Sequence, residues 1–208
     1  MNALICGGLA LAAGYSMALR SRVWLADKME KPYWPWRDQA IGLVSAVCGI
    51  AVGSLYHHLL QAVALSLLAS VLVLVAWTDL ECRIVPNRAL GVALLALLLV
   101  ALTAPLSQLE NMLQGGALLF LLTGGTRLLG LGGMGGGDVK MAAVLGMFFG
   151  PHFGSLILII GLVVALVHVS VMALLRRQSV LRQTFAMAPY LSLAGLLLTA
   201  ARPLGVPV

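Results

Sequence analysis

The sequence predicts an all-α protein, a polytopic bundle of six to eight transmembrane helices. Of its 208 residues, 61% are hydrophobic and only 10% are charged, and the mean hydropathy is +1.03. A soluble domain is roughly half apolar and about a quarter charged, so a soluble fold of this length would lack polar residues to cover its surface. The apolar runs are continuous, which is typical of spanning helices and not of barrel strands. We expect one transmembrane domain, residues 1–208.

Eight apolar runs are the candidate spans. The first is interpreted as a retained helix and not as a secretory signal, because its basic residues follow the apolar stretch instead of preceding it. Three runs are shorter than the roughly 20 residues that a crossing needs, which leaves the expected count between six and eight; they are 90–104, 139–150 and 189–202. In chain order the runs lie near 2–19, 40–56, 60–79, 90–104, 112–130, 139–150, 155–175 and 189–202.

Lysine and arginine residues occur in every second connection between the apolar runs. The odd-numbered connections and their flanks hold all of these residues except Arg202, whereas the even-numbered connections near 57–59, 105–111 and 151–154 hold none. The positive-inside rule therefore predicts that the odd connections are cytoplasmic and that both termini face outward. The stretch from Met29 to Arg37 carries two prolines and two tryptophans, which favours an interfacial loop.

Most of the seven acidic residues have ordinary explanations. Three lie among the bases of the first connection and are expected to be solvated: Asp27, Glu30 and Asp38. Glu81 lies near Arg83 in a turn, and Glu110 lies in an outer loop. The two that remain are Asp79, which ends the third run, and Asp138, which opens the sixth.

Asp79 and Asp138 map to the same side of the membrane. A carboxylate at the hydrocarbon boundary is costly and marks a candidate functional site, although each alone is also explained as a helix-end residue, with Asp138 as a cap. Two neighbouring carboxylates do not both ionise cheaply, so one can hold a proton while the other activates water, as in aspartic proteases. Because no histidine lies near either acid in sequence, we expect neither a metal nor a cofactor.

The segment 130–138 holds six glycines and ends in Asp138. Glycine allows a substrate strand to lie close to the backbone. A phosphate-binding loop is the first alternative, but that pattern requires Gly-Lys-Ser/Thr, whereas Gly-Asp-Val-Lys stands here. Helix packing through small residues is the second alternative.

These residues resemble the type IV prepilin peptidases, membrane aspartic proteases with a Gly-x-Gly-Asp motif. Asp79 followed by Pro86 and Asn87 is similar to the first aspartate segment of that family, and the stretch 185–191, which includes Pro189, is similar to the segment that opens its last helix. The Gly-x-Gly-Asp motif itself matches at four positions: Gly135, Gly137, Asp138 and Lys140.

The resemblance implies an endopeptidase that removes the basic leader of type IV prepilins or pseudopilins at the cytoplasmic face of the bacterial inner membrane. Asp79 and Asp138 would be its catalytic pair. Lys140 would either have a functional role, holding the glycine segment or biasing the charge of the pair, or anchor its helix at the headgroups. The implied partners are these substrates and membrane lipid, not nucleic acid. Larger members carry a cysteine-containing insert associated with N-methylation, but the connection 20–39 has no cysteine, which argues against zinc and methyltransferase activity here.

The alternative function is that of a small proton-coupled transporter, with Asp79 and Asp138 as the relay. A relay favours acids at mid-bilayer depth that connect both faces. Both acids lie at one face of the predicted bundle, so the peptidase interpretation is preferred.

Overall fold

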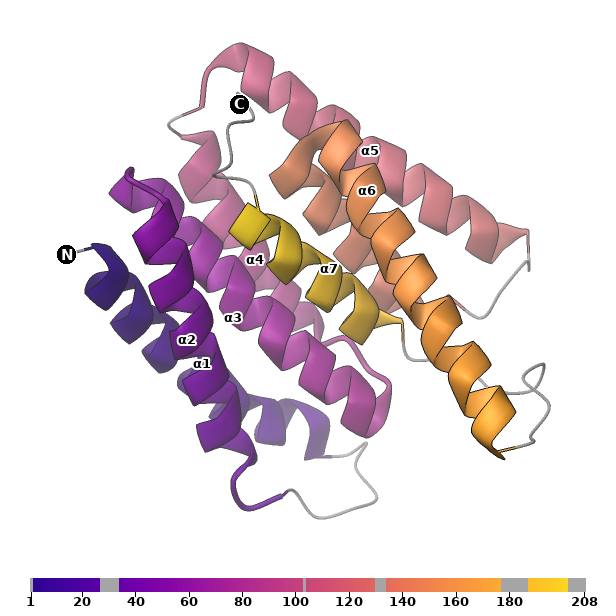
Figure 1. The fold of residues 1–208 in the computed structure, drawn as a ribbon. Helices are drawn as coiled ribbons and strands as arrows, with labels where there is room; N and C mark the ends of the chain where they lie inside the picture. The colour runs from indigo at the N-terminus through magenta and orange to yellow at the C-terminus, as the bar shows by residue number, and fades with distance from the viewer. Residues whose placement is uncertain (1, 27–33, 103, 130–133, 177–186, 202–208) are drawn as a thin grey trace.

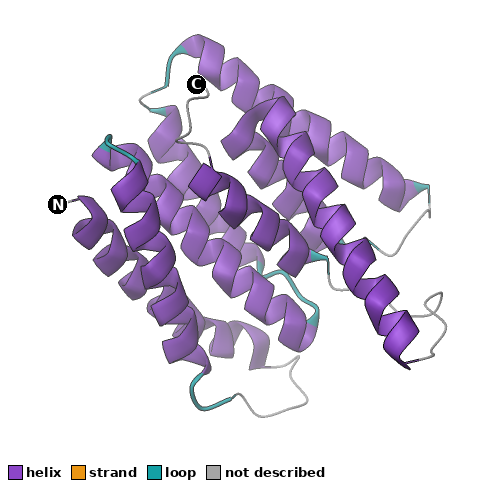
Figure 2. Ribbon diagram, viewed as in Figure 1, coloured by secondary structure: helices purple, strands orange, loops and turns teal. Residues whose placement is uncertain are grey.

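The apolar runs of the sequence fold as helices. The computed structural model describes residues 2–26, 34–102, 104–129, 134–176 and 187–201, and these residues contain no strand (Figure 2). The prediction of an all-α bundle is therefore confirmed. The helices, shown in Figure 1, are α1 (Asn2–Leu25), α2 (Arg37–Leu55), α3 (Leu59–Cys82), α4 (Asn87–Ala101), α5 (Leu106–Leu128), α6 (Gly136–Arg176) and α7 (Ala188–Ala201).

Within the described residues, four helices are long and apolar enough to cross a membrane, namely α1, α2, α3 and α6. The apolar helices α4 and α7 are shorter. Many leucine side chains on the outside of the bundle are exposed, including Leu4, Leu94 and Leu174. Lipid is the medium that such a surface fits, and the protein is an integral membrane protein.

The helix α6 is a hairpin and not one straight rod. Gly150 has φ 73° and ψ 179°, and Pro151 follows it. Proline has no N–H to continue the helical ladder, and the positive φ suits glycine. A Cβ added to Gly154 would lie 3.1 Å from the Cα of Gly146, whereas eight residues along a straight helix span about 12 Å. The runs at 139–150 and 155–175 are thus separate antiparallel segments, but the loop expected at 151–154 is replaced by a tight reversal.

The connections alternate between the two ends of the bundle, as the charge pattern predicts. At one end, the end of α3 contacts the starts of α2 and α7, through Glu81 with Arg37 and Asp79 with Ala188. At the same end, Lys140 near the start of α6 contacts Asn87 at the start of α4. We call this the aspartate end. At the opposite end, Asn2 contacts His57 and Tyr56 contacts Thr199.

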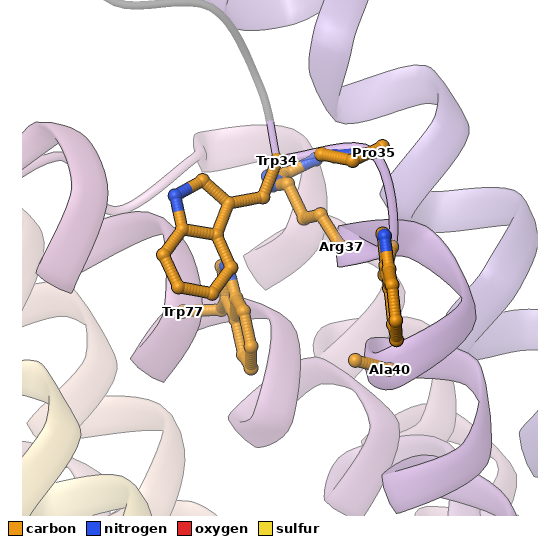
Figure 3. A pocket seen from close by; sticks show the side chains of 6 residues that line it. Trp34, Pro35, Arg37, Ala40 and Trp77 are labelled. Carbon is orange, nitrogen blue, oxygen red and sulfur yellow. The ribbon is translucent and has the colours of Figure 1, made fainter.

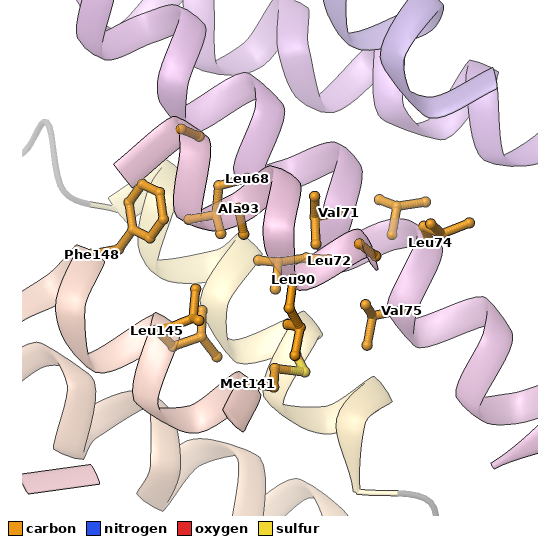
Figure 4. Close-up of a cluster of buried hydrophobic side chains, with 14 of the residues drawn as sticks. Leu68, Val71, Leu72, Leu74, Val75, Leu90, Ala93, Met141, Leu145 and Phe148 are labelled. Atoms are coloured by element: carbon orange, nitrogen blue, oxygen red, sulfur yellow. The ribbon is translucent and has the colours of Figure 1, made fainter. Parts of the chain in front are cut away.

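The helix α3 lies at the centre, between the α1–α2 pair and the α5–α6 pair (Figure 1). Its buried leucines and valines pack with side chains of α4 and α6, including Leu90, Met141 and Leu145 (Figure 4). Helices in lipid associate through close packing and not through a hydrophobic driving force between them. The site described next lies where α3 leaves this core.

Candidate active site

Asp79 lies in the last turn of α3 and is buried, with 4% of its surface exposed. Its Oδ2 accepts a hydrogen bond of 3.1 Å from the backbone N–H of Ala188, the first residue of α7. The first N–H groups of a helix have no partner within the helix and favour a negative charge beside them. Pro189 follows, and in a first helical turn its missing N–H costs nothing. The structure therefore joins the two predicted segments through Asp79 and Ala188, the residue before Pro189.

Asp138 lies in the first turn of α6 and is also buried, at 7% exposed. Its Oδ2 accepts a hydrogen bond of 3.1 Å from the N–H of Gly135, which is a capping contact. Its Oδ1 is buried and accepts no hydrogen bond from the described residues. An unsatisfied buried oxygen costs roughly 1–3 kcal/mol. Capping thus accounts for one oxygen of Asp138 and not for the other.

The two carboxylates lie at the same end of the bundle, Asp79 in the last turn of α3 and Asp138 in the first turn of α6. The chain changes direction after Asp79, because Arg83 caps the end of α3 in the left-handed conformation, at φ 56° and ψ 38°. Its N–H donates to the carbonyl of Asp79, a form of helix C-cap. Both acids are buried at the aspartate end, and the helices that carry them also pack together in the core.

The glycines before Asp138 allow the start of α6 to approach the turn after α3. A Cβ added to Gly137 would lie 2.7 Å from the Cβ of Val85, and one added to Gly136 would collide with the guanidinium of Arg127. Gly135 supplies the N–H that binds Asp138. The earlier glycines of this segment, at 130, 132 and 133, lie outside the described residues.

The polar residues predicted to support the motif also meet. The Nζ of Lys140 donates a hydrogen bond of 3.1 Å to the Oδ1 of Asn87. Pro86 precedes Asn87 in extended conformation and opens α4. The contact joins the start of α6 to the start of α4, and both predicted roles of Lys140 are compatible with it. Residues 185 and 186 of the last predicted segment lie outside the described residues.

The sequence profile of the type IV leader peptidase family matches residues 66–170, about half of the chain. The chain belongs to this family. The prepilin leader peptidase/N-methyltransferase of Bacillus subtilis (strain 168) is 34% identical over 111 residues, which cover 53% of this chain and 45% of that protein. The aligned part thus spans less than half of that relative's length. No solved structure matches the chain.

The residues that match the family include Asp79 and Asp138, but the helices α1, α2 and α7 lie outside the match. Within the described residues no group of three or more His, Cys, Asp or Glu side chains gathers as a metal site would require. Asp79 and Asp138 are the two aspartates inside the family region, and both are buried at the aspartate end.

Sequence reasoning was wrong about Asp38, which was expected to be solvated. It is 3% exposed and pairs with Arg22 and Arg37. The Arg37 side chain is fully buried, and its Nε donates a 2.8 Å hydrogen bond to Glu81. The sequence contains a weak signal for Arg37, since an arginine directly at the start of an apolar run must either reach water or find an acid.

A pocket of about 390 Å³ lies beside this buried ion pair, on the face of α3 turned toward α2 (Figure 3). Trp77 precedes Glu81 by one helical turn, and its Nε1 donates to the Glu81 carboxylate at 2.8 Å. Two further tryptophans on the pocket are largely exposed, as interfacial tryptophans are. The lining residues are Trp34, Pro35, Trp36, Arg37, Ala40 and Trp77.

Proposed function

We propose that this protein is an aspartic endopeptidase of the membrane that cleaves prepilins or pseudopilins between a basic leader and an apolar helix. The observation that carries the proposal is the burial of two carboxylates, Asp79 and Asp138, at the same end of the bundle. Both lie in the part of the chain that matches the type IV leader peptidase family. The named activity of the Bacillus subtilis relative supports the same substrate class.

The proposed chemistry uses the two aspartates in different protonation states. Two close carboxylates in a dry site favour one shared proton. The ionised carboxylate accepts a proton from water as the water oxygen attacks the scissile carbonyl, while the protonated carboxyl donates a hydrogen bond to the carbonyl oxygen. The C–N bond then breaks, and the leaving amine takes up a proton from the dyad. No step requires a metal or a cofactor.

We further propose that the aspartate end faces the cytoplasm of a bacterial inner membrane. Basic residues gather at this end, Arg83 in the turn after α3 and Arg37 and Lys140 in the first two turns of α2 and α6, and the basic side of a membrane bundle is the cytoplasmic side. The same charges repel a basic leader, so recognition is proposed to depend on depth and shape. An extended substrate with a small residue before the cut fits beside the glycines that precede Asp138.

The proposal is limited to peptidase activity. The Bacillus subtilis relative is also named as a methyltransferase, but the alignment with this chain covers only 45% of that protein. The connection between α1 and α2 contains no cysteine, so it cannot form the cysteine-containing insert that the larger relatives carry.

The test is cleavage of a purified prepilin by the purified protein in lipid nanodiscs, with the cut located by mass spectrometry. Substitution Asp79→Asn or Asp138→Asn preserves side-chain volume but removes the proton exchange, and each should lower the rate by roughly 100-fold or more. Glu110→Gln is the matched control, because Glu110 is exposed on α5 at the opposite end. Cleavage at the wild-type rate by either aspartate variant would refute the proposed mechanism.

A further inference from the structure

The last turn of α3 is held from two sides. Asp79 and Glu81 are two residues apart, which places their side chains about 200° apart around a helix. Accordingly, Asp79 contacts Ala188 of α7, and Glu81 contacts Arg37 of α2. The turn ends immediately afterwards at Cys82. Because the final carbonyls of a helix lack partners within the helix, such a turn depends on outside contacts to keep its shape.

The contact on the α2 side is buried and made of charged groups. Arg37 is 1% exposed, and the distance from its Nε to the Glu81 Oε2 is 2.8 Å. The same guanidinium donates to the carbonyl of Ala18 in α1 and to Asp38, each at 3.3 Å. A buried guanidinium fork fixes its acid in direction as well as in distance. The pair therefore anchors the end of α3 to both N-terminal helices.

Glu81 is also constrained by its own helix. Its second oxygen accepts the 2.8 Å hydrogen bond from Trp77, so both carboxylate oxygens have a fixed donor. Rotation or fraying of the last turn would break two charge-assisted bonds at once. The same movement would displace Asp79, which lies two residues before Glu81 in the same turn.

We propose that Arg37 is a positioning residue that acts through Glu81 to hold Asp79 at the place where it meets Asp138. The inference rests on the proposed function, and it gives a role in the reaction to α1 and α2, which lie outside the family match. The Arg37 guanidinium contacts Glu81, Asp38 and the carbonyl of Ala18, so the role proposed for it is indirect. Its effect is on the orientation of a catalytic group.

The test compares kcat and KM of Arg37→Lys and Glu81→Gln, corrected for the folded fraction measured by size-exclusion chromatography. Lysine keeps the charge of Arg37 but not its fork, and glutamine keeps the length of Glu81 but not its charge. A misplaced catalytic group lowers kcat, so each variant should lose roughly 10- to 100-fold in kcat while KM changes by less than about two-fold. Arg20→Gln, an exposed position on α1, is the control and should retain the wild-type values.

The double variant Arg37→Lys/Glu81→Gln shows whether the two residues act in series. If Arg37 acts through Glu81, the double variant loses no more kcat than the poorer single variant. Additive losses, or a wild-type kcat in folded Arg37→Lys, would overturn the inference. If Asp79→Asn is inactive while Arg37→Lys is normal, only the positioning role fails. An active Asp79→Asn variant would refute the dyad and this inference with it.

Discussion

Asp79 and Asp138 each have one carboxylate oxygen bound to a backbone N–H near a helix start, from Ala188 and Gly135 respectively. These bonds fix the direction of each carboxylate without using a side chain that could compete for the proton. The second oxygen of Asp138 accepts no bond from the described residues, which leaves it free to interact with water or substrate. Two backbone hydrogen bonds thus orient the two carboxylates on which the proposed chemistry depends.

Gly137 should not tolerate a methyl group. In Gly137→Ala the new Cβ would lie 2.7 Å from the Cβ of Val85, so the start of α6 would shift and carry Asp138 with it. We expect kcat to fall by roughly 10- to 100-fold, because small displacements of a catalytic group are costly. Steady-state cleavage assays measure this. Gly125→Ala on α5, where nothing lies within 4 Å of an added Cβ, should behave as wild type, and equal activity of the two variants would contradict the account.

That Asp79 and Asp138 lie at the same end of the bundle was predictable from sequence. Their role as a pair stays a prediction, which rests on the few structural explanations that a carboxylate at a hydrocarbon boundary has. The partner of Arg37 and the burial of Asp38 were not predictable. The acid that binds Arg37 is Glu81, 44 residues away in the chain, and no local pattern connects them. Asp38 has bases nearby in sequence, and such a neighbourhood normally indicates a solvated loop.

At the scale of helices, the reversal within α6 decides which segments line the site. It places Gly146 and Gly154 together and returns the chain toward the aspartate end, where Tyr190 of α7 contacts His168 with ring centroids 5.8 Å apart. The sequence showed two apolar runs here, 139–150 and 155–175. That no loop separates them was not predictable, since a Gly-Pro pair is compatible with either a kink or a turn.

Gly150→Ala should destabilise this hairpin. A φ of 73° with a ψ of 179° lies in a region that is essentially restricted to glycine, and it costs a residue with a side chain roughly 1–3 kcal/mol. We expect the free energy of unfolding in detergent to fall by about that amount, with a lower thermal midpoint. Circular dichroism during heating measures it. Gly91→Ala on α4, where an added Cβ meets nothing within 4 Å, serves as the reference, and an unchanged midpoint in Gly150→Ala would show that the reversal is not strained by a side chain.

For the whole molecule, composition alone was sufficient to predict a bundle of spanning helices, because 61% hydrophobic residues exclude a soluble fold of this size. Charge was sufficient to predict which connections share an end. The neighbours of each helix were not predictable. That α5 packs closely against α6 depends on glycine contacts, such as Gly115 against the backbone of Gly146, which the sequence does not pair.

The proposed orientation predicts opposite accessibility for the two ends of α5. Leu128 is 89% exposed at the aspartate end, and Ser107 is exposed at the other. In a variant without the three native cysteines, Leu128→Cys should react with a membrane-impermeant thiol reagent only in inside-out vesicles. Ser107→Cys should react only in right-side-out vesicles. The reverse pattern would place the aspartates outside and contradict the cytoplasmic assignment.

The most direct test of the central claim is whether Asp79 and Asp138 act as one unit. The rate of prepilin cleavage would be measured for Asp79→Asn, Asp138→Asn and the double variant, each as a folded protein in nanodiscs. Residues that act as a unit show strongly non-additive losses, so the account predicts that the double variant is no slower than either single variant, all three being slower than wild type by roughly 100-fold or more. Losses that multiply in the double variant would contradict it, because they would show that the two carboxylates act independently.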